Sequence, residues 1–162
     1  MDFIDSLGPA FLAHRLRRLE DLLVAQVGAA LALEGLTVPP KSLSTLLLLD
    51  ADGPLGPVDL ARRLRLSHPL MIRSLKLLER LGLVEVVENA ADHRRRAVRL
   101  TTFGRAEATT IRRFQARLSS AIDDAATEAG SDASALLTLL SRFSDTLTNN
   151  PVADRLNAKV AP

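Results

Sequence analysis

The sequence has 162 residues, of which 47% are hydrophobic, enough to fill the core of one ordinary domain. The apolar residues are mostly Leu, Ala and Val, and the absence of Tyr and Trp argues against an all-β fold. With 21 Lys and Arg against 19 Asp and Glu, total charge does not indicate nucleic-acid binding, and the absence of cysteine excludes disulfides, thiolate metal sites and thiol redox switches within the chain.

The first 36 residues carry the pattern of an amphipathic helix. Large apolar residues recur at three- and four-residue steps from Phe3 to Leu31. Gly8 and Pro9 predict a break near the start. A long helix should follow and end at about Glu34, because a glycine comes next.

Three shorter helices are predicted in the middle of the chain. Pro39 and Pro40 interrupt the helical pattern, and residues 42–50 then predict an almost wholly apolar, buried helix. Residues 52–57 are rich in Gly and Pro and predict a turn before a helix over residues 58–64.

A tight turn over residues 65–67 leads to a further helix. Ser67 is well suited to cap this helix, and Pro69 is compatible with its first turn. The helix should end at about Leu81, because Gly82 follows. Two short helices joined by a tight turn predict a helix-turn-helix.

A hairpin is predicted after this pair of helices. Residues 83–88 are rich in β-branched side chains, and residues 97–100 form a plausible return strand. Residues 89–96 would then form the tip. The order of helix, tight turn, helix and hairpin is that of a winged helix-turn-helix.

Two helices are predicted at the C-terminal end. Thr101 or Thr102 should cap a long helix that ends at about Ala129, and a second helix should cover residues 134–147. Residues 149–162 show little apolar periodicity, and we expect either a loose tail there or a segment that completes the C-terminal helices. The predicted fold class is therefore mainly α, with a minor β component.

Basic residues concentrate between Arg62 and Arg105. On a helical wheel the second helix of the pair has an apolar face of Met71, Leu75 and Leu78 opposite a row of cations. Such a helix fits the major groove of DNA, where its N-terminal residues can reach base edges and the rest can contact phosphates. The alternative is a solvated basic face on an ordinary amphipathic helix. The candidate DNA-binding residues of this recognition helix are Ser67, His68, Pro69, Leu70, Arg73, Ser74, Lys76 and Arg80, with Pro69, Leu70, Arg73 and Ser74 as base readers and Lys76 and Arg80 on phosphates.

The hairpin tip is also basic, because it contains three consecutive arginines. Arginine gains from the negative potential of a narrow minor groove, and a neighbouring carboxylate can hold a guanidinium in register. We expect Arg94 or Arg96 to enter the groove and Asp92 to orient it. The alternative is a solubilising charged loop. The candidate wing residues are Asp92, His93, Arg94, Arg95 and Arg96.

No pattern in the chain indicates catalysis. The three histidines are far apart and lack the spacing of a metal motif, and there is neither a phosphate-binding loop nor a nucleophile elbow. We therefore expect neither an enzyme nor a bound metal or cofactor. No apolar run approaches the roughly 20 residues of a membrane-spanning helix, so we expect a soluble, cytoplasmic protein.

Four motifs of the chain resemble the MarR (multiple-antibiotic-resistance regulator) family. They are Pro57-Val58-Asp59-Leu60-Ala61-Arg62-Arg63-Leu64 followed by Leu66-Ser67 in the first helix of the pair and the turn, Arg73 with Leu78-Glu79-Arg80-Leu81-Gly82-Leu83-Val84 in the recognition helix and just after it, Asp92-His93-Arg94 in the hairpin, and Leu100-Thr101-Thr102-Phe103-Gly104 after it. One departure is Lys76-Leu77, where many relatives carry Asp-Arg. The motifs cover about residues 40–110, and the helix order extends the resemblance to nearly the whole chain.

The resemblance implies a homodimer in which the first and last helices interlock. It divides the chain into an N-terminal dimerisation helix (1–38), a DNA-binding domain (39–102) and C-terminal dimerisation helices with the tail (103–162). The recognition helices would enter successive major grooves of a pseudo-palindromic operator of double-stranded DNA. The candidate dimerisation residues are Phe3, Ile4, Leu7, Phe11, Leu12, Leu139, Phe143 and Leu147.

The resemblance implies a transcriptional regulator that represses by covering its operator, either constitutively or until a small-molecule effector releases it. A ligand between the dimer helices and the winged domains would change the spacing of the recognition helices. The alternative is a winged-helix adaptor that binds a partner protein and no DNA, because a fold does not fix a function.

Overall fold

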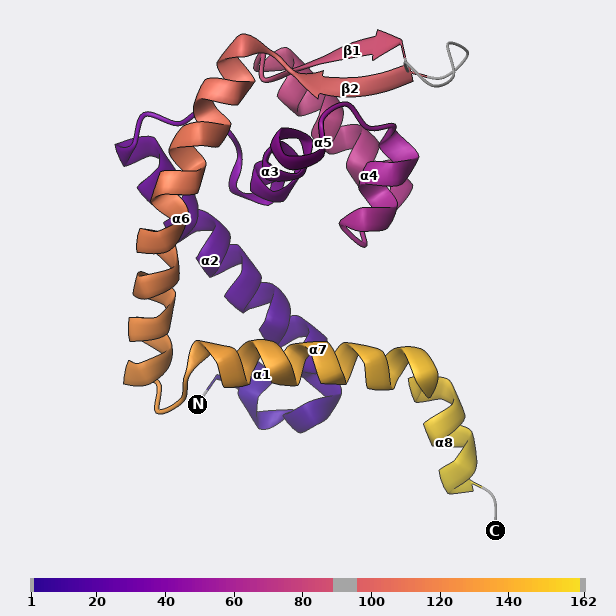
Figure 1. Cartoon of the computed structure of the whole chain (residues 1–162). Helices are drawn as coiled ribbons and strands as arrows, with labels where there is room; N and C mark the ends of the chain where they lie inside the picture. The colour runs from indigo at the N-terminus through magenta and orange to yellow at the C-terminus, as the bar shows by residue number, and fades with distance from the viewer. Residues whose placement is uncertain (1, 89–95, 161–162) are drawn as a thin grey trace. The chain divides into compact units, whose positions relative to one another are not determined.

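The computed structural model describes residues 2–88 and 96–160 (Figure 1). The chain divides into two compact units, one up to Arg113 and the other from Phe114. The described residues are mainly helical with one two-stranded antiparallel sheet, which confirms the predicted fold class. The elements in chain order are α1 (Phe3–Ser6), the 3-10 helix η1 (Gly8–Phe11), α2 (Leu12–Leu33), the 3-10 helix η2 (Pro40–Ser42), α3 (Leu43–Asp52), α4 (Pro57–Arg63), α5 (His68–Arg80), β1 (Val84–Glu88), β2 (Arg96–Leu100), α6 (Thr102–Glu128), α7 (Ala133–Asn149) and α8 (Val152–Val160).

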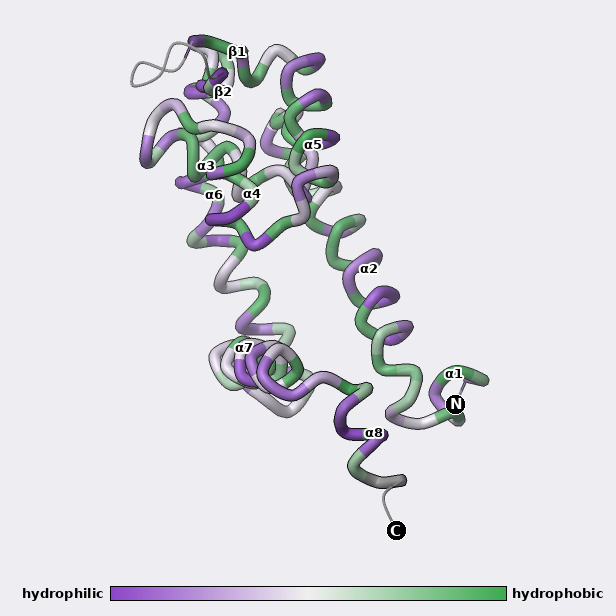
Figure 2. Tube along the Cα trace, turned by 90° about the vertical axis from the view of Figure 1, so that its right-hand side faces the viewer, coloured by the Kyte–Doolittle hydropathy of each residue, from purple (hydrophilic) through white to green (hydrophobic). Residues whose placement is uncertain are grey.

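The N-terminal helices confirm the predicted break and end. Gly8 has a φ of +69° at the start of η1, where the chain leaves α1, and Gly35 has a φ of +70° just after α2. Only one residue of the 22 in α2, Leu31, is buried. Apolar residues recur along the length of α2, where green segments alternate with purple ones in Figure 2.

The core of the first unit lies between the helix-turn-helix and its neighbours. Leu46 of α3, Leu60 of α4, and Met71 and Leu78 of α5 are completely buried, as is Leu83 just before β1. Burial of large side chains at about 25 cal/mol per Å² supplies most of the favourable free energy of folding. These residues come from consecutive short elements, so the core fixes α5 against α3, α4 and the sheet.

The turn between α4 and α5 is tight and differs from expectation at its cap. Arg65 has a φ of +52°, and the Leu66 N–H donates to the Ala61 carbonyl over 2.9 Å. Ser67 occupies the position before α5, but its side chain makes no capping hydrogen bond. The position predicted for the cap is therefore correct, but the predicted capping hydrogen bond is absent. Pro69 has no N–H in the first turn, so one of the usual donors to a capping hydroxyl is absent.

The predicted hairpin is present as an antiparallel pair. Val84 pairs with Leu100 and Glu88 with Arg96, and Leu55 forms an isolated bridge to Val98. The pairing corrects one expectation, because Arg96 belongs to strand β2 and not to the tip. Residues 89–95, which include the expected wing residues Asp92, His93, Arg94 and Arg95, lie outside the described residues.

The start of α6 packs tightly on the end of the recognition-helix segment. Thr101 caps α6, as one of the two threonines was predicted to do, with its Oγ1 accepting from the Gly104 N–H over 3.0 Å. A Cβ atom on Gly104 would lie 1.9 Å from the Leu83 carbonyl oxygen. Only glycine allows this approach, which explains the Leu-Thr-x-x-Gly spacing physically.

The second unit contains the remainder of α6 together with α7 and α8. Asp132 caps α7 by accepting from the Ala135 N–H over 2.6 Å. The expected loose tail is wrong, because residues 152–160 form α8. Pro151 cannot continue α7, and Val152 and Leu156 then recur at helical spacing, a pattern too short to stand out in the sequence. None of the described helices is long and apolar enough to cross a membrane.

Candidate nucleic-acid interface

The two faces of α5 separate as the helical wheel predicts. Met71 and Leu78 are completely buried and Leu75 is 7% exposed, whereas Arg73, Lys76 and Arg80 are exposed. These three cations, together with Glu79, line one shallow depression on the surface. The packing of one face against the core therefore holds the opposite, basic face in a fixed direction.

The residues at the N-terminal end of α5 are also accessible. Ser67, His68, Pro69 and Leu70 are all exposed, and Leu70 keeps 48% of its surface accessible. Ser74 differs, because it is half-buried and its Oγ lies 2.9 Å from the Oγ of buried Ser42. Its hydroxyl already has a partner, which makes it a weaker candidate for base contact than its neighbours.

The cations of the helix-turn-helix fall into two groups. Arg62 and Arg63 form ion pairs with Asp59 (2.8 Å) and Asp52. In contrast, no side-chain hydrogen bond or ion pair within the described residues involves Arg65, Arg73, Lys76 or Arg80. An unpaired exposed guanidinium or ammonium group is free to bind an anion. Arg65 was not selected from the sequence, although its position in the turn beside the recognition helix was visible there.

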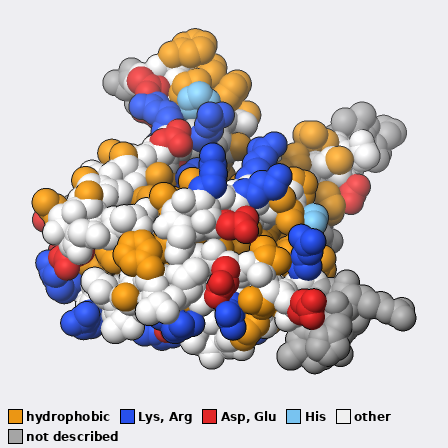
Figure 3. All heavy atoms as spheres, turned by 90° about the horizontal axis from the view of Figure 1, so that it is seen from above, with side chains coloured by type: hydrophobic (Ala, Val, Ile, Leu, Met, Phe, Trp, Pro, Cys, Tyr) orange, Lys and Arg blue, Asp and Glu red, His pale blue; other side chains and the backbone are white. Residues whose placement is uncertain are grey.

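Residues of the wing strands lie next to the recognition helix. A hollow of about 260 Å³ has Ile72 and Lys76 of α5 on one side and Val98 and Arg96 of β2 on the other. The structure thus brings together one predicted phosphate contact and one predicted wing residue. Several Lys and Arg side chains stand close to one another on the face seen from above in Figure 3.

A larger cavity lies on another side of α5. It has a volume of about 570 Å³ and is lined mainly by apolar side chains, including Val24 of α2 and Leu70 and Leu77 of α5. Arg73 and the ion pair between Lys41 Nζ and Glu20 Oε1 (2.8 Å) add charge to its lining. The hydrogen bond from Lys41 lowers the pKa of the Glu20 carboxyl.

The terminal helices expose large apolar side chains. On α1, η1 and α2, Phe3 is 75%, Phe11 42% and Leu12 37% exposed, whereas Ile4 and Leu7 are half-buried. In the second unit, Leu139 is 64% and Phe143 41% exposed, and Leu147 is half-buried. Exposed large apolar side chains on each of these two sets of helices are typical of interaction surfaces.

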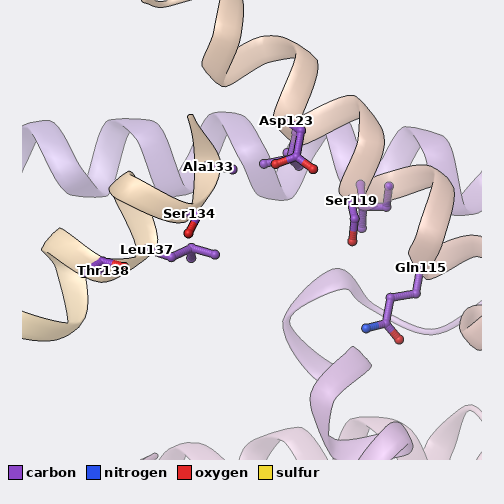
Figure 4. Close-up of a pocket in the computed structure, with 9 residues that line it drawn as sticks. Gln115, Ser119, Asp123, Ala133, Ser134, Leu137 and Thr138 are labelled. Atoms are coloured by element: carbon purple, nitrogen blue, oxygen red, sulfur yellow. The ribbon is translucent and has the colours of Figure 1, made fainter. Parts of the chain in front are cut away.

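A hollow of about 520 Å³ lies within the second unit. Its apolar lining comes from Leu118 and Ile122 of α6 and from Ala133 and Leu137 of α7. Figure 4 shows Ser119 and Asp123 on α6 and Ser134 and Thr138 on α7 around it. The hollow adds concave apolar surface beside the exposed face of α7.

The described fold is that of a winged helix-turn-helix, with α4 and α5 as the helix pair and β1 and β2 as the strands of the wing. Residues 34–95 match the sequence model of the MarR family, so this part of the chain, which holds the helix-turn-helix and the first wing strand, is similar to that family. No curated protein matches the sequence significantly.

Solved structures share the fold over most of the chain. A mutant of MarR from E. coli, complexed with operator DNA, is 22% identical with a TM-score of 0.65, over 91% of this chain and 99% of that chain. The S. aureus MepR–DNA complex is 20% identical with a TM-score of 0.63, over 85% and 96%. The transcriptional regulator SlyA is 14% identical with a TM-score of 0.66, over 86% and 95%. At these identities the likeness shows the fold.

Proposed function

We propose that the protein is a sequence-specific, dimeric DNA-binding regulator of transcription that acts as a repressor in the cytoplasm. The observation that carries this proposal is the exposed face of α5, where Arg73, Lys76 and Arg80 lie together without partners among the described residues. A buried opposite face holds these cations in place. Two of the structures that share the fold contain DNA, which supports a regulator over a protein-binding adaptor.

The contacts divide by their place on the helix. Residues at the N-terminal end of α5, from Ser67 to Arg73, would read base edges in the major groove, and Lys76 and Arg80 would hold phosphates. Arg96, at the end of β2 that leads from the tip, would stand beside the minor groove. The wing residues from Asp92 to Arg95 remain proposed contacts.

A second copy of the chain would cover the apolar faces of the terminal helices. Residues 1–38 and 103–162 would supply this interface, and residues 39–102 would bind DNA. Two-fold symmetry then places two recognition helices on a pseudo-palindrome, with half-sites about one helical turn apart. Phe3 exposes 75% of its surface and Leu139 exposes 64%, as expected for apolar side chains that become covered in a dimer.

A small-molecule effector would bind in the cavity between α2 and α5. Its volume of about 570 Å³ lies within the usual range for ligand sites, and its mainly apolar lining also includes the charged side chains of Glu20, Lys41 and Arg73. An apolar compound with one anionic group fits this chemistry. Because Leu70 and Arg73 line the cavity and are also candidate base readers, occupancy would compete with DNA contact.

The first test is an anisotropy titration against a pool of random duplex DNA at two salt concentrations, with sequencing of the bound fraction. We expect enrichment of a palindrome and an affinity that falls steeply with salt. Weak, salt-insensitive binding without enrichment, together with a protein partner in a pull-down that does not need DNA, would support the adaptor.

Two variants separate base contact from phosphate contact. Arg73→Ala should lower affinity for the enriched duplex by roughly tenfold and relax its sequence preference, whereas Arg80→Ala should weaken all duplexes alike and flatten the salt dependence. Arg62→Ala is the matched control, because Arg62 is already paired with Asp59. Parent-like binding by both test variants would refute the groove assignment.

A further inference from the structure

A buried carboxylate links α6 to the chain that precedes η2. Glu107 is the one charged side chain among the described residues that is buried, with 4% of its surface exposed. Its Oε1 accepts from the Thr37 N–H (2.8 Å) and the Thr37 hydroxyl (2.6 Å), and its Oε2 accepts from the Val38 N–H (3.0 Å). All three donors are uncharged, so the burial of Glu107 depends on these hydrogen bonds.

The chain that Glu107 holds is stiff. Pro39 and Pro40 follow Val38 and have no N–H, so the backbone donors of residues 37–40 are those of Thr37 and Val38 alone. Both of these donors go to Glu107. The two proline rings also fix φ, so a displacement at residues 37 and 38 is passed on to the residues that follow.

The far end of the same segment contacts the recognition helix. Ser42 is 3% exposed, and its Oγ lies 2.9 Å from the Oγ of Ser74, the residue after Arg73 on α5. Between the two ends, Lys41 pairs with Glu20 of α2. Residues 37–42, here called the 37–42 segment, are thus hydrogen-bonded to α6, α2 and α5 in turn.

The 37–42 segment also forms a wall of the cavity beside α5. Pro39, Pro40, Lys41 and Ser42 line it, opposite residues of α5 that include Arg73 and Ser74. A ligand in the cavity would therefore touch the segment and the recognition helix together.

We propose that Glu107 is a positioning residue that couples α6 to the recognition helix through the 37–42 segment. Movement of α6, or of the segment when the cavity fills, shifts Ser74 and with it the base-reading end of α5. This inference rests on the proposed DNA-binding function and assigns its regulation to a contiguous set of hydrogen bonds. Coupling of this kind affects sequence-specific contacts first, because base readout needs a closer fit than phosphate contact.

The test compares Glu107→Gln with Glu128→Gln, which removes an exposed carboxylate from the same helix. A glutamine offers one acceptor and places an NH₂ group against an N–H donor of residue 37 or 38. We expect Glu107→Gln to weaken binding to a duplex enriched by the parent about tenfold, as the loss of a charge-assisted hydrogen bond would. Binding to a scrambled duplex at low salt should change less than about twofold, since phosphate contacts tolerate small shifts.

Amide hydrogen exchange supplies a readout that does not need DNA. Exchange in the first turns of α5 should accelerate in Glu107→Gln and stay parental in Glu128→Gln. The milder variant Ser42→Ala breaks the other end of the segment and should give the same α5 signature if Glu107→Gln folds poorly.

The outcomes distinguish the coupling from the function on which it rests. Unchanged α5 exchange in both Glu107→Gln and Ser42→Ala, with an unchanged ratio of enriched to scrambled binding, would show that Glu107 only caps the backbone. Failure of the parent to enrich any duplex would refute the proposed function, whereas α5 exchange would still decide the coupling.

Discussion

The winged helix-turn-helix and the terminal helices use equally apolar residues in opposite ways. In the former, Leu46, Leu60 and Leu78 are completely buried by neighbours from the same chain. In the latter, Phe3 and Leu139 expose 75% and 64% of their surfaces. The first region buries its apolar side chains within the chain, whereas the second leaves them exposed and available to another surface.

This difference explains why one region can be interpreted from a single chain and the other cannot. A recognition helix is held in place by local packing, so its basic face is defined within the chain. In the proposed dimer, the terminal helices would acquire a defined environment when a second copy covers them. Variants that affect one region and leave the other unchanged test this difference.

The largest effect is expected from charges on the exposed face of α7. The double variant Leu139→Glu with Phe143→Glu should dissociate the dimer and weaken operator binding by roughly 100-fold or more, because the two half-sites would no longer bind together. Light scattering after gel filtration and a DNA titration measure these effects. Ser141→Glu, elsewhere on α7, is the control, and a double variant that remains dimeric would contradict the assigned interface.

Filling the contact between α6 and Leu83 should destabilise the winged region. In Gly104→Ala the new Cβ would meet the Leu83 carbonyl oxygen at 1.9 Å, and the backbone would have to move. We expect a loss of about 1–3 kcal/mol in the free energy of unfolding by urea. Gly28→Ala, whose Cβ would lie 3.4 Å from Pro40 Cγ, should be tolerated. Equal stability of the two variants would mean that α6 does not pack as described.

A smaller effect of opposite sign is expected at the turn of the helix-turn-helix. Arg65 has a φ of +52°, which glycine adopts more easily. Arg65→Gly should therefore raise stability by up to about 1 kcal/mol. If the unpaired guanidinium contacts a phosphate, the same variant should weaken all duplexes alike and reduce the salt slope by about one. Unchanged DNA binding would remove Arg65 from the interface.

The smallest effect concerns the ion pair between α2 and η2. Since the folded state lowers the pKa of Glu20, the pair contributes stability above the unfolded pKa, and this contribution is lost as pH falls through the lower, folded value. Melting temperatures of the parent and Glu20→Gln should differ slightly at neutral pH and converge in acid. A gap that widens in acid would reverse the assigned sign.

Most element boundaries could be predicted because their signals are local. Gly8, Gly35 and Gly82 adopt positive φ where the sequence predicted breaks or helix ends, and the two faces of α5 follow its 3.6-residue period. Helix α8 was missed because nine residues with three large apolar positions carry too weak a pattern. Arg96 was misplaced by a single position at the end of a strand, where local signals are least informative.

The class of fold and the basic face of the recognition helix could be predicted from the sequence, because backbone preference and helical periodicity act between residues a few positions apart. The environments of Glu107 and Ser74 could not, because their partners lie 69–70 and 32 positions away and are brought near only by the tertiary structure. A glutamate on an amphipathic helix has the same local pattern whether it faces water or the N–H groups of Thr37 and Val38. Its environment depends on where the chain returns, and that is set by the packing of the whole core.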